Sequence, residues 1–212
     1  MTITFDQEMR RIVADLYWKT EGSVLVNTRE GFLLVSGAHS PIYLDGRNIP
    51  SNPLAMDLIT SFARAVAEEL PIDVIAGGES AGIPYSSVLS QKMGKPAIYV
   101  RKEPKKYGTQ SQIEGNLKPG QRVLLTEDLI TDGQSKESFI KGIRDAEGIV
   151  EYCLSVFDRL QGGRERLKQI GVDLMSLTDM DTLLAVGSER GYISREDYRI
   201  IRNYLEGQQI FN

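Results

Sequence analysis

Apolar positions in the first third of the chain predict one helix followed by several short strands. Residues at helical spacing form a stripe that predicts a helix over residues 5–19: Phe5, Met9, Ile12, Val13 and Leu16. Strand-like runs follow at 24–26, 32–35 and 42–44, separated by glycine and turn residues. Asn52 before Pro53 then predicts the start of a helix that extends to about residue 70, because proline is favoured in the first turn.

Beyond residue 70, continuous apolar runs alternate with helical patterns. The predicted strands cover residues 74–76, 97–100, 123–125 and 152–157. The predicted helices cover about 82–93, 135–146, 162–171, 178–186 and 194–204. Thr178 with Asp181 and Ser194 with Asp197 resemble capping boxes in which Asp replaces Glu. This alternation predicts an α/β fold with a mostly parallel central sheet flanked by helices. We expect a single domain, with a small lobe over roughly residues 1–50 and a core over 51–212.

Composition narrows the class of protein. The 212 residues are 41% apolar and 25% charged, which is ordinary for a soluble globular protein. A net charge of −4 argues against a general nucleic-acid or membrane-surface binder, although one local basic cluster exists, made of Arg101, Lys102, Lys105 and Lys106. Charges occupy the N-terminus where a signal peptide needs an apolar core, and no apolar segment approaches the ~20 residues of a membrane span. We therefore expect a cytoplasmic protein.

The single cysteine and the single histidine carry little chemistry. Cys153 lies in an apolar run and is interpreted as a small buried hydrophobe, since it has no second cysteine to pair with. His39 is interpreted as an incidental turn residue rather than a general base. No cluster of Cys and His suggests a zinc site.

The segment from Arg122 to Lys136 is the most informative part of the chain. An apolar strand leads to Glu127 and Asp128, and a small polar loop then leads into a helix; the loop comprises Thr131, Asp132, Gly133, Gln134 and Ser135. Loop amides and hydroxyls beside the positive end of a helix suit a phosphate, and the carboxylates suit sugar hydroxyls. The pattern therefore indicates a ribose phosphate. The alternative is an acidic strand end followed by an ordinary helix cap.

Two further loops are expected at the same edge, because the carboxyl ends of parallel strands lie together. The first contains Glu79, Ser80, Ala81 and Gly82, whose exposed amides suit an anion; the alternative is a tight turn without a ligand. The second is the basic cluster at 101–106, followed by a polar segment that is a candidate mobile loop. Its alternative interpretation is a solvated basic hairpin.

The ordered set of motifs resembles the type I phosphoribosyltransferases, and within them the orotate phosphoribosyltransferases. The acidic strand and its loop resemble the signature that binds 5-phosphoribosyl 1-pyrophosphate (PRPP). The run Ser36-Gly-Ala-His-Ser-Pro-Ile-Tyr43, the Asp45-Gly-Arg47 that follows it, and Asp158-Arg159 resemble the orotate side of that family. The resemblance covers roughly residues 31–163. It implies the type I phosphoribosyltransferase fold, in which the N-terminal lobe is a hood, and transfer of ribose 5-phosphate from PRPP to orotate.

The resemblance also implies residue roles. Glu127 and Asp128 are expected to hold the ribose hydroxyls, and residues 131–135 the 5′-phosphate. Pyrophosphate is expected to contact Glu79, Ser80, Ala81, Gly82, Arg101, Lys102 and Lys105. Orotate is expected to contact Tyr43, Thr131 and Arg159, with the guanidinium forming a fork on the carboxylate. Lys105 and Asp128 are the candidate catalytic residues.

Cofactor and partners follow from the same resemblance. Magnesium is expected to be held mainly by substrate oxygens and water, so no protein metal ligand is assigned. A loop that closes over the neighbouring subunit's site implies a homodimer. No nucleic-acid or membrane partner is expected.

Four positions depart from the family pattern. Many members have a lysine where this chain has Val35, some have a histidine at Tyr107, and Gln110 and Ser111 are neutral where some members are basic. Two alternatives therefore stay open: a related phosphoribosyltransferase that acts on another base, and a non-catalytic sensor of PRPP or nucleotides on the same fold.

Overall fold

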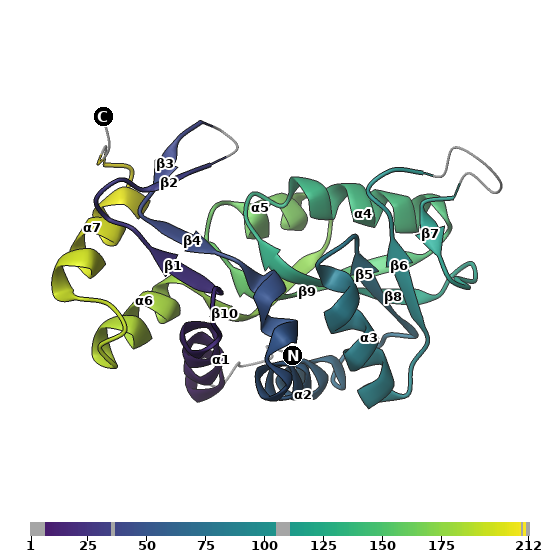
Figure 1. Ribbon diagram of the computed structural model, residues 1–212. Coiled ribbons are helices and arrows are strands. Elements are labelled where there is room, and N and C mark those ends of the chain that lie inside the picture. Colours follow the sequence, from purple (N-terminus) through teal and green to yellow (C-terminus); the bar gives the residue numbers. More distant parts are fainter. Residues whose placement is uncertain (1–6, 35–36, 105–110, 209, 211–212) are drawn as a thin grey trace.

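A six-stranded sheet forms the centre of the molecule (Figure 1). The computed structural model describes residues 7–34, 37–104, 111–208 and 210. In spatial order the strands are β10 (Asp173–Asp179), β9 (Ile149–Asp158), β8 (Arg122–Ile130), β5 (Val74–Gly78), β6 (Ala97–Val100) and β7 (Ile113–Glu114). All neighbouring pairs are parallel except β6 with β7, which is antiparallel. This confirms the predicted α/β class with a mostly parallel sheet.

Helices cover both faces of the sheet because side chains alternate along its central strands. Ile75 and Leu124 face one core, which is shared with α1 (Gln7–Lys19), α2 (Pro53–Ala67), α3 (Gly82–Met93) and α6 (Met180–Glu189). Val74 and Leu125 face the other core, which is shared with α4 (Gln134–Asp145) and α5 (Gly163–Gln169). Two-sided burial explains why the runs at 74–76 and 123–125 are apolar throughout. Cys153, on β9, is fully buried, as expected.

The lobe consists of two short antiparallel pairs outside the main sheet. β1 (Val24–Val26) pairs with β4 (Ile42–Leu44), and β2 (Phe32–Leu33) with β3 (His39–Ser40). The 3-10 helix η1 (Gly46–Ser51) connects β4 to α2, at whose start the Asn52 side chain accepts a hydrogen bond from the Ala55 amide. Helix α7 (Arg195–Leu205) lies beside the lobe in Figure 1. The two are joined by a hydrogen bond from Thr28 Oγ1 to Asp197 Oδ1 (2.6 Å).

Strands β3, β7 and β10 were not predicted, and one helix start was misplaced. Strand β10 has no sequence prediction because Ser176 and Thr178 interrupt its apolar run, yet both are buried, and the Thr178 hydroxyl donates to the Arg10 carbonyl (2.9 Å). The predicted capping box at Thr178 is therefore wrong. Asp179 is the N-cap of α6, and its carboxylate accepts from the Thr182 amide (2.8 Å).

The other capping prediction is confirmed. Ser194 is the N-cap of α7, and its hydroxyl accepts a hydrogen bond from the Asp197 amide (3.0 Å). A capping side chain satisfies one of the free amides of the first helical turn. Within the described residues, no helix is both long enough and apolar enough to cross a bilayer.

Candidate active site

The two acidic residues lie inside β8 rather than beyond it. The strand continues to Ile130, five residues past the end expected from its apolar run at Leu125, and therefore includes Glu127 and Asp128. Neighbouring strand residues point to opposite faces, so the two carboxylates have different surroundings. Glu127 is 3% exposed, while Asp128 is half-buried.

Glu127 is paired with a lysine that the sequence interpretation did not assign. Lys136 Nζ, from the first turn of α4, lies 3.1 Å from Glu127 Oε2. Burial raises the pKa of Glu127 to about 7, and the ammonium of Lys136 acts against this rise. The pKa of Lys136 is itself raised, because Glu127 and Asp128 outweigh the effect of its burial, so it is a cation at neutral pH.

The loop after β5 packs closely against Glu127. Any side chain at Gly78 would overlap the Glu127 carboxylate and would come within 2.5 Å of the Phe139 ring. A Cβ at Gly82 would lie 3.2 Å from Glu127 Oε1 and 2.5 Å from the Thr126 carbonyl oxygen. Glycine at these two positions therefore allows close packing against Glu127, and it also leaves backbone amides exposed. Ala81 and Ser80 lie in the same turn, and Ser80 is exposed.

The loop after β8 leaves the N-terminus of α4 open. Gly133 is the N-cap, with φ of 80°, and has no side chain of its own to cap the helix. The Asp132 carboxylate accepts a hydrogen bond from the Gln134 amide (3.1 Å), and Gln134 and Ser135 are exposed. Free amides at the positive end of a helix dipole suit an anion. The structure thus places the predicted phosphate loop, including Thr131, next to the acidic pair.

The basic segment joins the loop after β5. Glu79 Oε2 accepts a hydrogen bond from the Lys102 amide (2.8 Å), which connects the two loops directly. Arg101 lies 3.5 Å from the carboxylate of Glu114 on β7. Lys105 lies outside the described residues, as do Val35, Tyr107 and Gln110.

The lobe approaches the acidic pair through the segment that enters η1. A Cβ at Gly46 would lie 3.1 Å from Asp128 Oδ2. Beside it, Arg47 donates to both carboxylate oxygens of Asp45 (2.6 and 2.8 Å) and to the Tyr43 hydroxyl (3.3 Å). Burial raises the pKa of Asp128, while the charges of Lys136 and Arg47 oppose that rise.

Arg159 completes this edge at the end of β9. Its amide donates to the Ile130 carbonyl (3.0 Å), its side chain is half-buried, and its Nε has no hydrogen-bond partner among the described residues. Burial lowers the pKa of Arg159, and the phenols of Tyr204 and Tyr43 act in the opposite direction. Tyr43 therefore lies near enough to Arg159 to act on its charge. Tyr204, on α7, was not foreseen, because no local pattern connects the tail to this edge.

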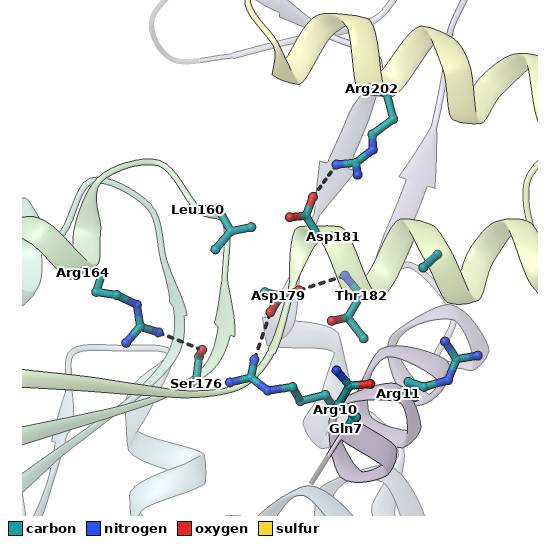
Figure 2. Close-up of a pocket in the computed structure, with 11 residues that line it drawn as sticks. Gln7, Arg10, Arg11, Leu160, Arg164, Ser176, Asp179, Asp181, Thr182 and Arg202 are labelled. Carbon is teal, nitrogen blue, oxygen red and sulfur yellow. Dashed lines mark hydrogen bonds and ion pairs between the residues drawn. The ribbon is translucent and has the colours of Figure 1, made fainter. Parts of the chain in front are cut away.

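A separate cavity of about 730 Å³ lies beside β10 (Figure 2). Its lining comes mainly from α1, β10, α6 and α7, and it does not include the acidic pair or Lys136. Its cations are paired: Arg10 lies 2.9 Å from Asp179, Arg202 contacts Asp181, and Arg164 donates to Ser176 (3.4 Å). These pairs are consistent with a structural role for the cavity walls.

The described residues include no group of three or more His, Cys, Asp or Glu side chains placed to hold a metal ion. Two carboxylates beside a lysine are a poor set of ligands for a resident divalent ion, because the ammonium already balances charge there. The donor set fits a metal that arrives bound to a phosphate substrate.

Known proteins resemble the chain over most of its length. Orotate phosphoribosyltransferase of Sinorhizobium fredii (strain NBRC 101917 / NGR234) is 38% identical over 203 residues, which cover 93% of this chain and 87% of that protein. No protein-family model matches the chain.

Solved structures resemble it as well. Orotate phosphoribosyltransferase from Aeropyrum pernix has a TM-score of 0.75 at 30% identity, over 86% of this chain and 99% of that chain. The Mycobacterium tuberculosis H37Rv enzyme in complex with PRPP has a TM-score of 0.68 at 26% identity, over 82% and 98%. UMP synthase of Leishmania donovani has a TM-score of 0.81 at 28% identity, over 92% of this chain but only 42% of that chain.

Proposed function

The chain belongs to the orotate phosphoribosyltransferase family, and we propose that the site at the carboxyl edge of its sheet transfers ribose 5-phosphate from PRPP to orotate. The products are orotidine 5′-monophosphate and pyrophosphate, in the pathway of pyrimidine synthesis. The observation that carries the proposal is one edge at which an acidic pair, a helix N-terminus with a glycine N-cap and a half-buried arginine meet.

The ribose phosphate of PRPP is proposed to lie over the ends of β8 and α4. The carboxylates of Glu127 and Asp128 accept hydrogen bonds from the ribose hydroxyls. Residues 131–135 surround the 5′-phosphate with amides and hydroxyls, which the open N-terminus of α4 favours.

Pyrophosphate is proposed to lie between the two loops that Glu79 connects. The turn from Glu79 to Gly82 supplies amides, and Arg101, Lys102 and Lys105 supply positive charge. When the bond from ribose C1′ to the pyrophosphate oxygen breaks, that oxygen gains negative charge, and nearby cations stabilise it.

Orotate is proposed to bind against Tyr43, Thr131 and Arg159. The guanidinium of Arg159 pairs with the carboxylate of orotate, which gives its buried Nε a partner. The ring nitrogen attacks C1′ as an anion, so no strong protein base is needed. The protein's contribution is alignment of the nucleophile and stabilisation of charge.

Magnesium and a second subunit complete the proposal. Magnesium would be held mainly by the substrate rather than by residues of this chain, and it would supply neutralisation of charge on the leaving pyrophosphate. The family resemblance is the support for a homodimer with shared active sites. A cytoplasmic location remains a prediction from the sequence.

The direct test is a spectrophotometric assay of the purified protein with PRPP, magnesium and orotate, run beside uracil, hypoxanthine and adenine. We expect PRPP-dependent loss of orotate absorbance and no product from the other bases. Product from another base alone would replace the proposal with a different phosphoribosyltransferase. Absence of product with all four bases, despite PRPP binding, would favour a sensor.

Replacing Arg159 by leucine is expected to raise the KM for orotate about 10- to 150-fold. That range corresponds to loss of a charge-assisted hydrogen bond of about 1.5–3 kcal/mol. The KM for PRPP should change little, because Arg159 is assigned to orotate alone. Steady-state kinetics with each substrate varied in turn measures both constants.

A matched control removes an arginine from the opposite end of the same sheet. Arg122 is exposed at the amino end of β8, and Arg122→Leu should leave both constants near their original values. An unchanged KM for orotate in Arg159→Leu would contradict the assignment of this residue.

A further inference from the structure

The buried contact between Lys136 and Glu127 has no role in the reaction as proposed so far. The side chains are 11% and 4% exposed, and their charged atoms lie 3.1 Å apart. Taking two charges out of water is costly, and a pair of neutral residues would pack there without that cost. A buried ion pair at this position therefore calls for a functional explanation.

The second carboxylate oxygen of Glu127, Oε1, faces away from Lys136. Oε1 is buried and has no hydrogen-bond partner among the described residues. It lies against the turn that carries Gly78 and Gly82, where no larger residue fits. The carboxylate is thus held by Lys136 on one side and enclosed by the backbone of Gly78 and Gly82 on the other, so its position is fixed.

We propose that Lys136 is a positioning residue for PRPP, which keeps Glu127 charged and fixed between the phosphate-binding helix and the pyrophosphate turn. The inference rests on the proposed function and assigns to it a residue that does not itself touch the reacting atoms. Lys136 acts from the first turn of α4, so a single turn of helix carries both the amides for the 5′-phosphate and the counter-charge for the acidic pair.

The groups around Glu127 determine how the site responds to pH. They are Lys136 from α4, Asp128 from β8 itself, and the Cys153 thiol from β9. Lys136 stays charged, because its pKa is raised, and burial raises the pKa of Cys153 so that the thiol stays neutral. Glu127 is therefore the group that titrates near pH 7, and PRPP binding should weaken as pH falls through that value.

The test is the dissociation constant of PRPP, measured by calorimetry with magnesium between pH 6 and 9. An opposite charge at this distance shifts a carboxyl pKa by about 1–3 units. Lys136→Met should therefore raise, by about that amount, the pH below which PRPP affinity falls. Affinity at pH 7 should then fall about tenfold or more and recover as pH rises. Lys136→Arg keeps the positive charge and should show the same pH dependence of PRPP affinity as the unaltered protein. The titration of PRPP's own phosphates is common to all variants and cancels in the comparison.

Two outcomes separate this inference from the proposed function. If the unaltered protein binds PRPP but Lys136→Met has the same pH profile, the positioning role is wrong and the proposed function stands. If the unaltered protein binds no PRPP at any pH, the proposed function fails and the inference fails with it.

A double variant covers the case in which Lys136→Met does not fold. Replacing both partners, as Lys136→Met with Glu127→Gln, removes both charges and leaves no unpaired ion in the interior. This protein should bind PRPP weakly, and its pH dependence near pH 7 should be only that of PRPP's own phosphates, without the contribution of Glu127. If the double variant had the same pH dependence as the unaltered protein, a group other than Glu127 would titrate near pH 7, and the inference would be overturned.

Discussion

Replacing Lys105 by alanine is expected to lower kcat about 10²- to 10³-fold. As pyrophosphate departs, negative charge grows on its oxygen, and a cation placed there binds the transition state more strongly than the ground state. PRPP affinity should therefore change far less than turnover. Single-turnover kinetics together with PRPP calorimetry separates the two effects.

The control for this variant removes a lysine far from the edge. Lys118 is exposed in the turn before β8, at the amino side of the sheet, and Lys118→Ala should leave kcat unchanged. Equal turnover in Lys105→Ala and the unaltered protein would rule out the assignment of residues 101–106 as the pyrophosphate segment.

Replacing Gly78 by alanine is expected to have the largest effect among the glycines of the site. The added methyl group would overlap the Glu127 carboxylate and press on the Phe139 ring, so β5 or Glu127 must shift. Overpacking of this kind costs about 1–3 kcal/mol of stability. Displacement of a binding group by about 1 Å can cost about 100-fold in rate, so we expect kcat/KM for PRPP to fall by that order.

Gly94→Ala provides a control with a comparable loss of stability and no effect on the site. Gly94 ends α3 with φ of 63°, and a Cβ there meets nothing within 4 Å. A left-handed conformation costs an L-residue about 1–2 kcal/mol. Thermal unfolding should thus shift in both variants, whereas only Gly78→Ala should lose activity. Full activity in Gly78→Ala would contradict the packing of Glu127 against this turn.

Features that depend on local pattern could be predicted from the sequence. The run at 74–76 is buried on both faces, so it is apolar without interruption and is easily identified as a strand. The run at 97–100 is identified in the same way, because its residues are all apolar or aromatic and Ile98 and Val100 are buried. The phosphate loop at 131–135 was equally visible, because its acids, small residues and helix follow one another directly in the chain.

Features that depend on distant contacts could not be predicted. A lysine in the first turn of a helix is usually solvated, and nothing near Lys136 in the chain indicates that its ammonium turns inward to Glu127. Tyr204 reaches the neighbourhood of Arg159 only because α7 folds back beside the lobe. Strand β10 was hidden for a related reason, since the buried hydroxyl of Thr178 is satisfied by a partner in α1.

The single cysteine gives the sheet a built-in chemical reporter. Cys153 is fully buried at the register position opposite Leu125, and burial raises the pKa of its thiol, so the native protein resists alkylation. A thiol reagent reaches this position only when the layer of α4 and α5 opens away from the sheet. The rate of modification by such a reagent therefore measures how often the centre of the enzyme opens. A ligand that slows this rate stabilises the closed state, and the size of the decrease measures that stabilisation.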